Sequence, residues 1–486
     1  MHISSLPSPY GIGTFGKEAY KFVDFLKESG QKCWQILPIC PTSFGDSPYQ
    51  SCSSYAGNPY FIDLDFLEEE GLLEKDEYSN IFWGGDTNTV DYGNLYDKRY
   101  VVLKKATKRF LKKIPDDYNS FIKKNKFWID DFAVFMAIKD AYNGIAWNMW
   151  PKNLRNRDEE ALKQAEIIYK DDIEFWKALQ YIFFKQWYEL KAYANKNGIE
   201  IIGDIPIYVS LDSVDVWKSP KLFQLDDNKD PIDVAGCPPD GFSADGQLWG
   251  NPLYNWDYMA EDDYSWWVSR INYLCNIYDV LRIDHFRGFD SYYAIPSGET
   301  TACNGRWKKG PGINLFKTVE RKIGRKNIIA EDLGYMTESV KKLLEESGFP
   351  GMKVLEFAFD SRDSNNAEYF PDKYTSNCVA YTGTHDNDTV KGWFENALSD
   401  DVELAREYLK IKDNDEVNWK MMDAVWASRA DLVIVQAQDI LGLDQKSRMN
   451  IPSTVGGNWC WRVNAGAFTC ETSLKLYNKM KKFGRM

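Results

Sequence analysis

The chain has 486 residues, of which 44% are hydrophobic and 15% aromatic, so it is long enough to bury a sizeable core in one large domain or two. A formal net charge of −13 argues against binding to nucleic acid or to an anionic membrane, because both need a basic surface. The nine cysteines form no C-x-x-C pair, and no apolar run approaches the roughly 18 residues of a membrane span. We therefore expect a globular protein of the cytoplasm.

Short apolar runs alternate with segments of helical period along the chain. The runs predict strands at residues 2–6, 33–39, 199–207, 279–286, 327–333, 353–359, 378–384 and 431–438. A helix that ends near Gly30 is predicted from apolar residues at i, i+3, i+4 and i+7, which are Ala19, Phe22, Val23 and Leu26. Thr337 and Gly348 are placed to begin and end another helix. Eight strand–helix units predict an α/β fold, a TIM-type (β/α)8 barrel, with functional residues at the C-terminal ends of its strands.

The spacing of the predicted strands is uneven, which indicates insertions. Too many residues separate the second strand from the third for one helix, and two aromatic-rich stretches between them predict helices. We expect a large, mainly helical insertion over residues 41–197. Residues 208–278 are rich in glycine, proline and aromatic side chains, and we expect a loop-rich insertion over the C-terminal rim. The whole chain, residues 1–486, is predicted to be a single barrel domain with these insertions.

One glycine pattern near the N-terminus imitates a dinucleotide-binding loop. Gly11, Gly13 and Gly16 have the G-x-G-x-x-G spacing, but the strand that should carry an acidic residue about 20 positions on is CWQILPICP, which contains prolines instead. Only three histidines are present, which argues against a His-rich zinc site. We expect neither a cofactor nor a metal ion.

Acidic residues stand at or just beyond the C-terminal ends of four predicted strands, and they are Asp204, Asp284, Glu331 and Asp386. One such acid is commonly a helix cap or a surface charge, but four around one barrel rim favour a functional site. Clustered carboxylates without a metal are typical of glycosyl transfer. In a retaining mechanism, a nucleophilic carboxylate and a general acid lie about 5 Å apart across the glycosidic bond, and a covalent glycosyl-enzyme forms.

The segment VLRIDHFRGF suggests how one of these acids stays ionised. Alternation along a strand puts Arg282 and Asp284 on one face, so we expect the guanidinium to lower the pKa of Asp284. The same alternation turns His285 away from Asp284. Arg287 falls in the following loop.

The other two acids of the predicted rim suit different tasks. Glu331, in IIAEDLG, has no basic neighbour in the sequence, which is consistent with an acid that keeps its proton. His385 and Asp386 follow a glycine and are placed to reach sugar hydroxyls. Hydrogen bonds there strengthen as an oxocarbenium-like transition state develops.

These residues and the motifs around them resemble the amylomaltase, or disproportionating-enzyme, family of 4-α-glucanotransferases, which are relatives of the α-amylases. The resemblance covers nearly the full length, in the family's order. The segments that carry it are SLPSPYGIGTFG, WQILPICPT, GDSPYQSCSSYAGNPYFID, GDIPIYV, PPDGFSADGQLWGNPLY, LRIDHFRGF, AEDLG, THDND and NIPSTVGGNWCWR. Several are too long for chance similarity.

The resemblance implies roles at the matching positions. Asp284 would be the nucleophile, Glu331 the acid/base and Asp386 the stabiliser of the transition state. The residues implied to bind substrate are Arg282, His385, Tyr49, Ser47, Asp240, Trp249 and Asp204. A second glucan site is associated with the positions of Phe44 and Tyr96. Phe44 stands where some relatives have tyrosine, so ring stacking is kept while a hydroxyl contact is lost.

The expected partners are maltooligosaccharides and α-1,4-glucans of the starch or glycogen type, with glucose or glucan acceptors. Aromatic loops over the cleft would favour an acceptor sugar over water. One alternative is a hydrolytic α-glucosidase or α-amylase with the same carboxylates. Another is a glucan-binding barrel without catalysis, against which the presence of all three acids argues. The sequence leaves the oligomeric state open.

Overall fold

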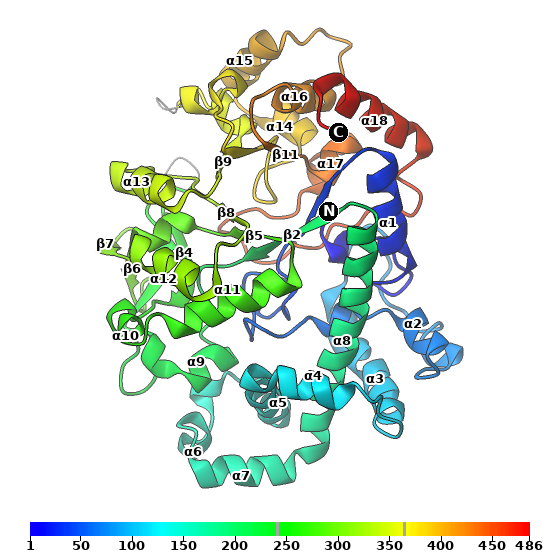
Figure 1. Cartoon of the computed structure of the whole chain (residues 1–486), viewed down its shortest axis with the longest axis vertical. Helices are drawn as coiled ribbons and strands as arrows, with labels where there is room; N and C mark the ends of the chain where they lie inside the picture. Colours follow the sequence, from blue (N-terminus) through cyan, green and yellow to red (C-terminus); the bar gives the residue numbers. More distant parts are fainter. Residues whose placement is uncertain (240–242, 363–365) are drawn as a thin grey trace.

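The computed structural model of the chain describes residues 1–239, 243–362 and 366–486 (Figure 1). Its parallel strands are β1 Cys33–Gln35, β2 Glu200–Ile205, β5 Val280–Ile283, β8 Ile328–Ala330, β9 Gly351–Val354, β10 Cys378–Tyr381 and β11 Leu432–Ile434. They pair in the orders β1-β2-β5-β8 and β9-β10-β11. The two sheets meet where the N–H of Ala330 donates to the carbonyl of Pro350 (2.9 Å). Because these strands are parallel and follow chain order, they form the wall of a TIM-type barrel.

Helices precede, connect and follow the barrel strands, as expected for an α/β fold. They are α1 Lys17–Glu28, α8 Lys170–Lys196, α11 Ser265–Ile277, α12 Ile313–Ile323, α13 Glu338–Ser347, α14 Val390–Asn396, α15 Ser399–Leu409, α16 Val417–Trp426, α17 Ala437–Ile440 and α18 Cys470–Phe483. Two predicted helix ends are confirmed: Gly30 has a φ of 72° just beyond α1, and the hydroxyl of Thr337 accepts the N–H of Val340 at the start of α13. The last helix, α18, packs against α1 (Figure 1).

The first predicted strand, residues 2–6, is wrong. The structure has a short 3₁₀ helix there, Ile3–Ser5. Ile3 and Leu6 are both buried and stand three residues apart, which is the spacing of a 3₁₀ turn and not the alternation of a strand. Pro7, which lacks an N–H, follows at once. The wall of the barrel therefore contains seven of the eight predicted strands within the described ranges. The strand predicted at 353–359 is displaced, because β9 covers Gly351–Val354 and Leu355–Phe359 forms a 3₁₀ helix.

Further helices lie between β1 and β2, and Figure 1 shows them together below the barrel strands. They are α2 Leu64–Glu69, α3 Tyr92–Phe110, α4 Tyr118–Lys124, α5 Lys126–Ala141, α6 Lys152–Arg155 and α7 Glu159–Ile168. The long helix α8 holds this segment through two buried glutamines. Gln180 accepts the N–H of Gly57 (2.7 Å) and donates to its carbonyl (2.9 Å). Gln186 makes the same pair of contacts with Asp63 (2.7 and 3.3 Å).

Two glycines allow close packing around β2. At Gly57, an added Cβ would lie 2.0 Å from the ring of Phe183 on α8. At Gly203, in β2, an added Cβ would lie 2.2 Å from the ring of Tyr278. Neither position has room for a side chain. Since Asp204 directly follows Gly203, the packing of Tyr278 also fixes the strand end that carries this acid.

A third sheet is antiparallel, with the order β4-β3-β6-β7. Its strands are β3 Asp233–Cys237, β4 Gln247–Pro252, β6 Ser291–Pro296 and β7 Arg306–Lys309. Residues 208–278, which the sequence suggested to be rich in loops, contain β3 and β4 together with α9 Val214–Lys218, α10 Trp256–Glu261 and α11. In the described ranges, we find no helix with the length and apolar content needed to cross a membrane.

Candidate active site

Three of the four predicted acids lie at the ends of neighbouring parallel strands. Asp204 is in β2, while Asp284 and Glu331 directly follow β5 and β8. Backbone hydrogen bonds continue past the strand ends, from the N–H of Asp284 to the carbonyl of Ile205 (3.0 Å) and from the N–H of Glu331 to the carbonyl of Ile283 (2.9 Å). The strand pairing that builds the barrel wall therefore also brings these carboxylates to one edge.

Arg282, in β5, contacts two of these acids. Its Nη1 atom lies 2.6 Å from Oδ2 of Asp204 and 3.1 Å from Oδ1 of Asp284. The side chains of Arg282 and Asp204 are buried, whereas that of Asp284 is 28% exposed. Burial works against the charge on Arg282, but the two carboxylates outweigh it and raise the pKa of the guanidinium. The site therefore has a permanent cation between two acids.

The pKa values of both Asp284 and Glu331 are raised. For Asp284, burial is the largest cause and neighbouring carboxylates add to it, while Arg282 lowers the pKa. Arg282 thus acts in the predicted direction, but burial outweighs it. For Glu331, burial raises the pKa, although Arg282 and the N–H groups of Leu333 (2.8 Å) and His285 (2.6 Å) favour the ionised form. Two coupled carboxyls of this kind can hold one proton between them, which is what a nucleophile and a general acid require.

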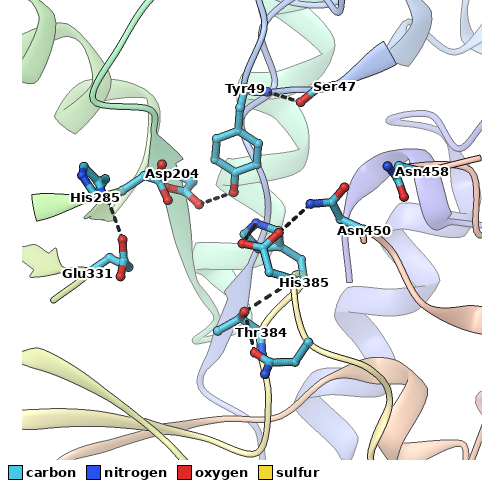
Figure 2. A network of polar contacts seen from close by, with 12 residues as sticks. Ser47, Tyr49, Asp204, His285, Glu331, Thr384, His385, Asn450 and Asn458 are labelled. Carbon is cyan, nitrogen blue, oxygen red and sulfur yellow. Dashed lines mark hydrogen bonds and ion pairs between the residues drawn. The ribbon is translucent and has the colours of Figure 1, made fainter. Parts of the chain in front are cut away.

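Tyr49 joins this charged group to an aromatic cluster (Figure 2). Its hydroxyl donates to Oδ2 of Asp204 (2.8 Å), and its ring stacks on His385 with centroids 5.2 Å apart. Trp459 lies 5.7 Å from both rings. Burial raises the pKa of Tyr49 and lowers that of His385, so the phenol keeps its proton and the imidazole is neutral at pH 7. This cluster offers flat ring surfaces and neutral donors beside the carboxylates.

Asp386 lies in the loop between β10 and α14, and its side chain is 47% exposed. Its Oδ1 atom accepts from Nδ2 of Asn450 (2.6 Å), and its carbonyl accepts from Nη2 of Arg448 (2.5 Å). His385 Nε2 is 3.4 Å from its other carboxylate oxygen. The sequence reasoning did not assign Arg448 and Asn450. The segment NIPSTVGGNWCWR, which begins at Asn450, was the only signal that pointed to this region.

His285 contacts both Trp249 and Glu331. Trp249, in β4, meets the ring of His285 edge to face with centroids 4.8 Å apart. His285 has a left-handed φ of 51°, and its N–H is the one that donates to Glu331 (Figure 2). The strand ends before His285, so its backbone contacts the acid while its ring faces the tryptophan. Asp240, from the same predicted loop as Trp249, lies outside the described residues.

The remaining predicted residues lie toward the helices between β1 and β2. The hydroxyl of Ser47 accepts the N–H of Tyr49 (3.2 Å), so Ser47 shapes the turn that presents Tyr49. Phe44 and Tyr96 are 70% and 49% exposed, which leaves both rings open to a ligand. Burial, followed by the charge of Asp46, raises the pKa of Tyr96 to about 12. The charge of Asp46 therefore acts on Tyr96, although one precedes α3 and the other belongs to it.

The fold is that of a TIM-barrel enzyme, and its rim gathers carboxylates of the kind that act on glycosidic bonds. A family model described as 4-alpha-glucanotransferase matches residues 1–468. The 4-alpha-glucanotransferase of Clostridium butyricum is 50% identical over 487 residues, which cover 100% of this chain and 100% of that protein. The 4-alpha-glucanotransferase of Thermus thermophilus is 42% identical, covering 98% and 96% of the two chains. The chain belongs to the 4-alpha-glucanotransferase family.

A solved structure agrees with this assignment. The amylomaltase of Streptococcus agalactiae in complex with acarbose has a TM-score of 0.97 to this chain and 47% sequence identity. The alignment covers 100% of this chain and 98% of that one. The barrel and the segments around it therefore follow the same path in both proteins.

Proposed function

We propose that this protein is a 4-α-glucanotransferase that moves α-1,4-glucan segments from maltooligosaccharide, starch or glycogen donors to glucose or glucan acceptors. The observation that carries the proposal is the position of Arg282 between Asp204 and Asp284, on the strand next to the one that ends at Glu331. This arrangement supplies a charged nucleophile and a protonated acid side by side, which a retaining reaction requires.

In the first half-reaction, Asp284 is the nucleophile and Glu331 the general acid. A carboxylate oxygen of Asp284 bonds to the anomeric carbon while the glycosidic bond breaks. Glu331 gives its proton to the leaving oxygen, so the released glucan gains a free 4-hydroxyl. The direct contact with Arg282 favours the ionised form of Asp284, and Glu331, which is only 8% exposed, keeps the shared proton.

In the second half-reaction, the 4-hydroxyl of an acceptor sugar replaces the leaving group. It gives its proton to Glu331 as its oxygen bonds to the anomeric carbon, and the bond to Asp284 breaks. Asp386 and His385 bind hydroxyls of the reacting sugar and stabilise the oxocarbenium-like transition state. The rings of Tyr49 and Trp249 give an acceptor sugar apolar surface, so that it displaces water and transfer exceeds hydrolysis.

Maltotriose separates transfer from hydrolysis. The protein is incubated with maltotriose, and the products are followed over time by chromatography. Glucose together with oligosaccharides longer than maltotriose supports the proposal. Glucose and maltose without longer chains would instead identify a hydrolase, and an unchanged substrate would contradict both. Asp284→Asn serves as the negative control.

The remaining expectations are proposals of the same kind. A cytoplasmic location is supported by nine cysteines without a C-x-x-C pair. Binding of maltooligosaccharides is supported by the acarbose in the Streptococcus agalactiae structure. A single barrel over residues 1–486 with insertions at 41–197 and 208–278 is supported by the run of helices between β1 and β2 and by the position of β3 and β4. A second glucan site at Phe44 and Tyr96 is supported by the exposure of both rings.

A further inference from the structure

Three buried acids lie beneath the loop that carries His385 and Asp386. Glu356 follows β9, Asp388 ends the loop, and Asp439 is on α17. Their exposed fractions are 4%, 8% and 1%. Three carboxyls that interact electrostatically in a buried region cannot all be ionised without strong repulsion.

Hydrogen bonding indicates which of the three acids is neutral. Both oxygens of Asp439 accept hydrogen bonds, one from the N–H of Val390 and one from the hydroxyl of Thr382, each at 2.8 Å. Asp388 accepts from the N–H of Thr389 (2.7 Å). In contrast, Oε1 of Glu356 is buried without a hydrogen-bond partner in the described part of the chain. A neutral carboxyl tolerates such a place far better than a charged one, so the proton resides on Glu356.

Glu356 also touches the loop above it. Its Oε1 atom lies against Gly383, where an added Cβ would be only 2.9 Å away. The side chain of Asn387 lies beside Glu356 at the same point next to Gly383, and it accepts the N–H and the hydroxyl of Thr384, both at 3.0 Å. The hydroxyl of Thr384 in turn accepts the N–H of Asp386 (3.3 Å). A continuous path of contacts therefore joins Glu356 to Asp386.

We propose that Glu356 is a positioning residue, a neutral acid that supports the turn from Thr384 to Asn387 and thereby fixes Asp386 for the reaction. This role rests on the function proposed above for Asp386. It requires no contact between Glu356 and the substrate.

The ionised form of Glu356 would disturb this arrangement. The charged and titratable groups that face it are Asp388 and Asp439, which repel its charge, and Arg448, which attracts it. Since Arg448 also donates to the carbonyl of Asp386, an ionised Glu356 competes with that contact. Burial raises the pKa of Glu356, so the carboxyl is neutral below that raised pKa and becomes charged as the pH rises through it. The turnover number should therefore fall on the alkaline side.

Glutamine and leucine at this position test the role. Glu356→Gln keeps the shape and stays neutral at every pH. Glu356→Leu removes the contact with Asn387. The matched control is Glu403→Gln, on the exposed face of α15. For each variant, kcat and KM for maltotriose are measured from acid to alkaline pH, and folding is checked by circular dichroism.

We expect Glu356→Gln to retain most of the kcat at neutral pH. Its alkaline fall, plotted as log kcat against pH, should be less steep than in the unmodified protein and the Glu403 control, because only the loss of the proton from Glu331 remains. In Glu356→Leu, kcat should fall about tenfold or more with little change in KM, because a small displacement of Asp386 weakens the transition state more than substrate binding.

Identical alkaline limbs in Glu356→Gln and the unmodified protein would overturn the role, and so would an undiminished kcat in a folded Glu356→Leu. If the leucine variant does not fold, the glutamine profile decides alone. If the unmodified protein does not elongate maltotriose at all, the proposed function is contradicted as well. If the unmodified protein elongates maltotriose but Glu356→Gln has the same pH dependence of kcat, only the role of Glu356 is contradicted.

Discussion

Among single residues, Arg282 is the cation that two acids of the site share. It contacts Asp204 at 2.6 Å and Asp284 at 3.1 Å, and only 4% of its side chain is exposed. Removing one member of a buried charge pair leaves the other uncompensated, at a cost of about 3–5 kcal/mol. Arg282 therefore has two effects at once, since it stabilises the buried end of β2 and favours the ionised form of the proposed nucleophile.

The substitution Asp284→Asn separates these two effects. We expect transfer from maltotriose to fall by about 10³-fold or more, because the covalent intermediate can no longer form. The free energy of unfolding, measured with urea, should change little, because burial disfavours the charge on Asp284 whereas the contact with Arg282 favours it, and asparagine removes both effects. Asp257→Asn, on the exposed surface of α10, is the control. Elongation of maltotriose by Asp284→Asn at the unmodified rate would contradict the assignment of the nucleophile.

Tyr49→Phe tests the hydroxyl that donates to Asp204. The ring can still stack on His385, but Asp204 loses one of its two donors. A hydrogen bond to a charged group contributes about 1.5–3 kcal/mol, so kcat/KM should fall roughly tenfold to a hundredfold. Steady-state kinetics with maltotriose measure this loss. Tyr258→Phe, on α10, should have no effect, and equal kinetics in the two variants would show that the Tyr49 hydroxyl is not needed.

The acids of the site could be predicted because each lies at or just after the end of an apolar run. The pattern and length of such a run indicate where a strand ends. Arg448 and Asn450 could not be found in this way. Their contacts with Asp386 span 62 and 64 residues and depend on how a loop rich in glycine and proline returns to the barrel. The net pKa shift of Asp284 was also beyond the sequence, because burial is a property of the folded chain.

At the scale of elements, α8 does more than cover the barrel. Its buried glutamines Gln180 and Gln186 hydrogen-bond the N–H and the carbonyl of Gly57 and Asp63, as a neighbouring strand would. The segment from Gly57 to Asp63 therefore has a fixed path without belonging to a sheet. Since Tyr49 lies only eight residues before Gly57, this attachment also limits the movement of the turn that presents its ring.

Gln180→Leu should destabilise the protein. The leucine fills a similar volume but leaves a buried N–H and a buried carbonyl of Gly57 unpaired, and each unpaired group costs about 1–3 kcal/mol. Urea unfolding should therefore show a loss of about 2–6 kcal/mol. The control is Gln164→Leu, at an exposed position of α7, for which little change is expected. Equal stability of the two variants would mean that other groups or water replace the glutamine.

Most helices and strands could be predicted from periodicity and from their end signals, as α1 and α13 illustrate. The exception at residues 2–6 has a physical reason. Five residues with two apolar side chains fit both a strand and a 3₁₀ turn, and the tertiary environment decides between them. The antiparallel strands β3 and β4 were missed because their sequence is rich in glycine and proline, which local reasoning assigns to loops.

For the molecule as a whole, the barrel could be predicted because strand–helix units repeat along the chain, although one such unit alone would not predict a barrel. The arrangement of the strands in one wall places side chains from distant segments around one rim. Folding also buries acids, and burial raises the pKa of such an acid above its value in the unfolded chain. The free energy of unfolding therefore depends on pH.

Asp439 allows this dependence to be measured. Burial raises its pKa from 3.8 to about 6. Between these values, the folded chain binds the proton more tightly than the unfolded chain does, so the contribution of Asp439 to stability falls as the pH rises and is constant above about 6. In Asp439→Asn, this loss is absent. Relative to the unmodified protein, the unfolding free energy of the variant should therefore increase by about 3 kcal/mol across that interval.

Urea titrations at a series of pH values provide the measurement. Asp413→Asn, at an exposed position, should show a constant difference from the unmodified protein. A constant difference for Asp439→Asn as well would mean that Asp439 is not buried in the way the structure describes.

The contact between Gly203 and Tyr278 restricts how sequences of this kind can diverge. A side chain gained first at Gly203 meets the tyrosine ring at 2.2 Å and displaces the strand that carries Asp204. If Tyr278 is first replaced by a smaller residue, the protein passes through an intermediate with a cavity, which costs stability but leaves the backbone of β2 in place. Of the two mutational orders, only the second avoids an intermediate that damages the rim. The history of position 203 is therefore tied to that of position 278.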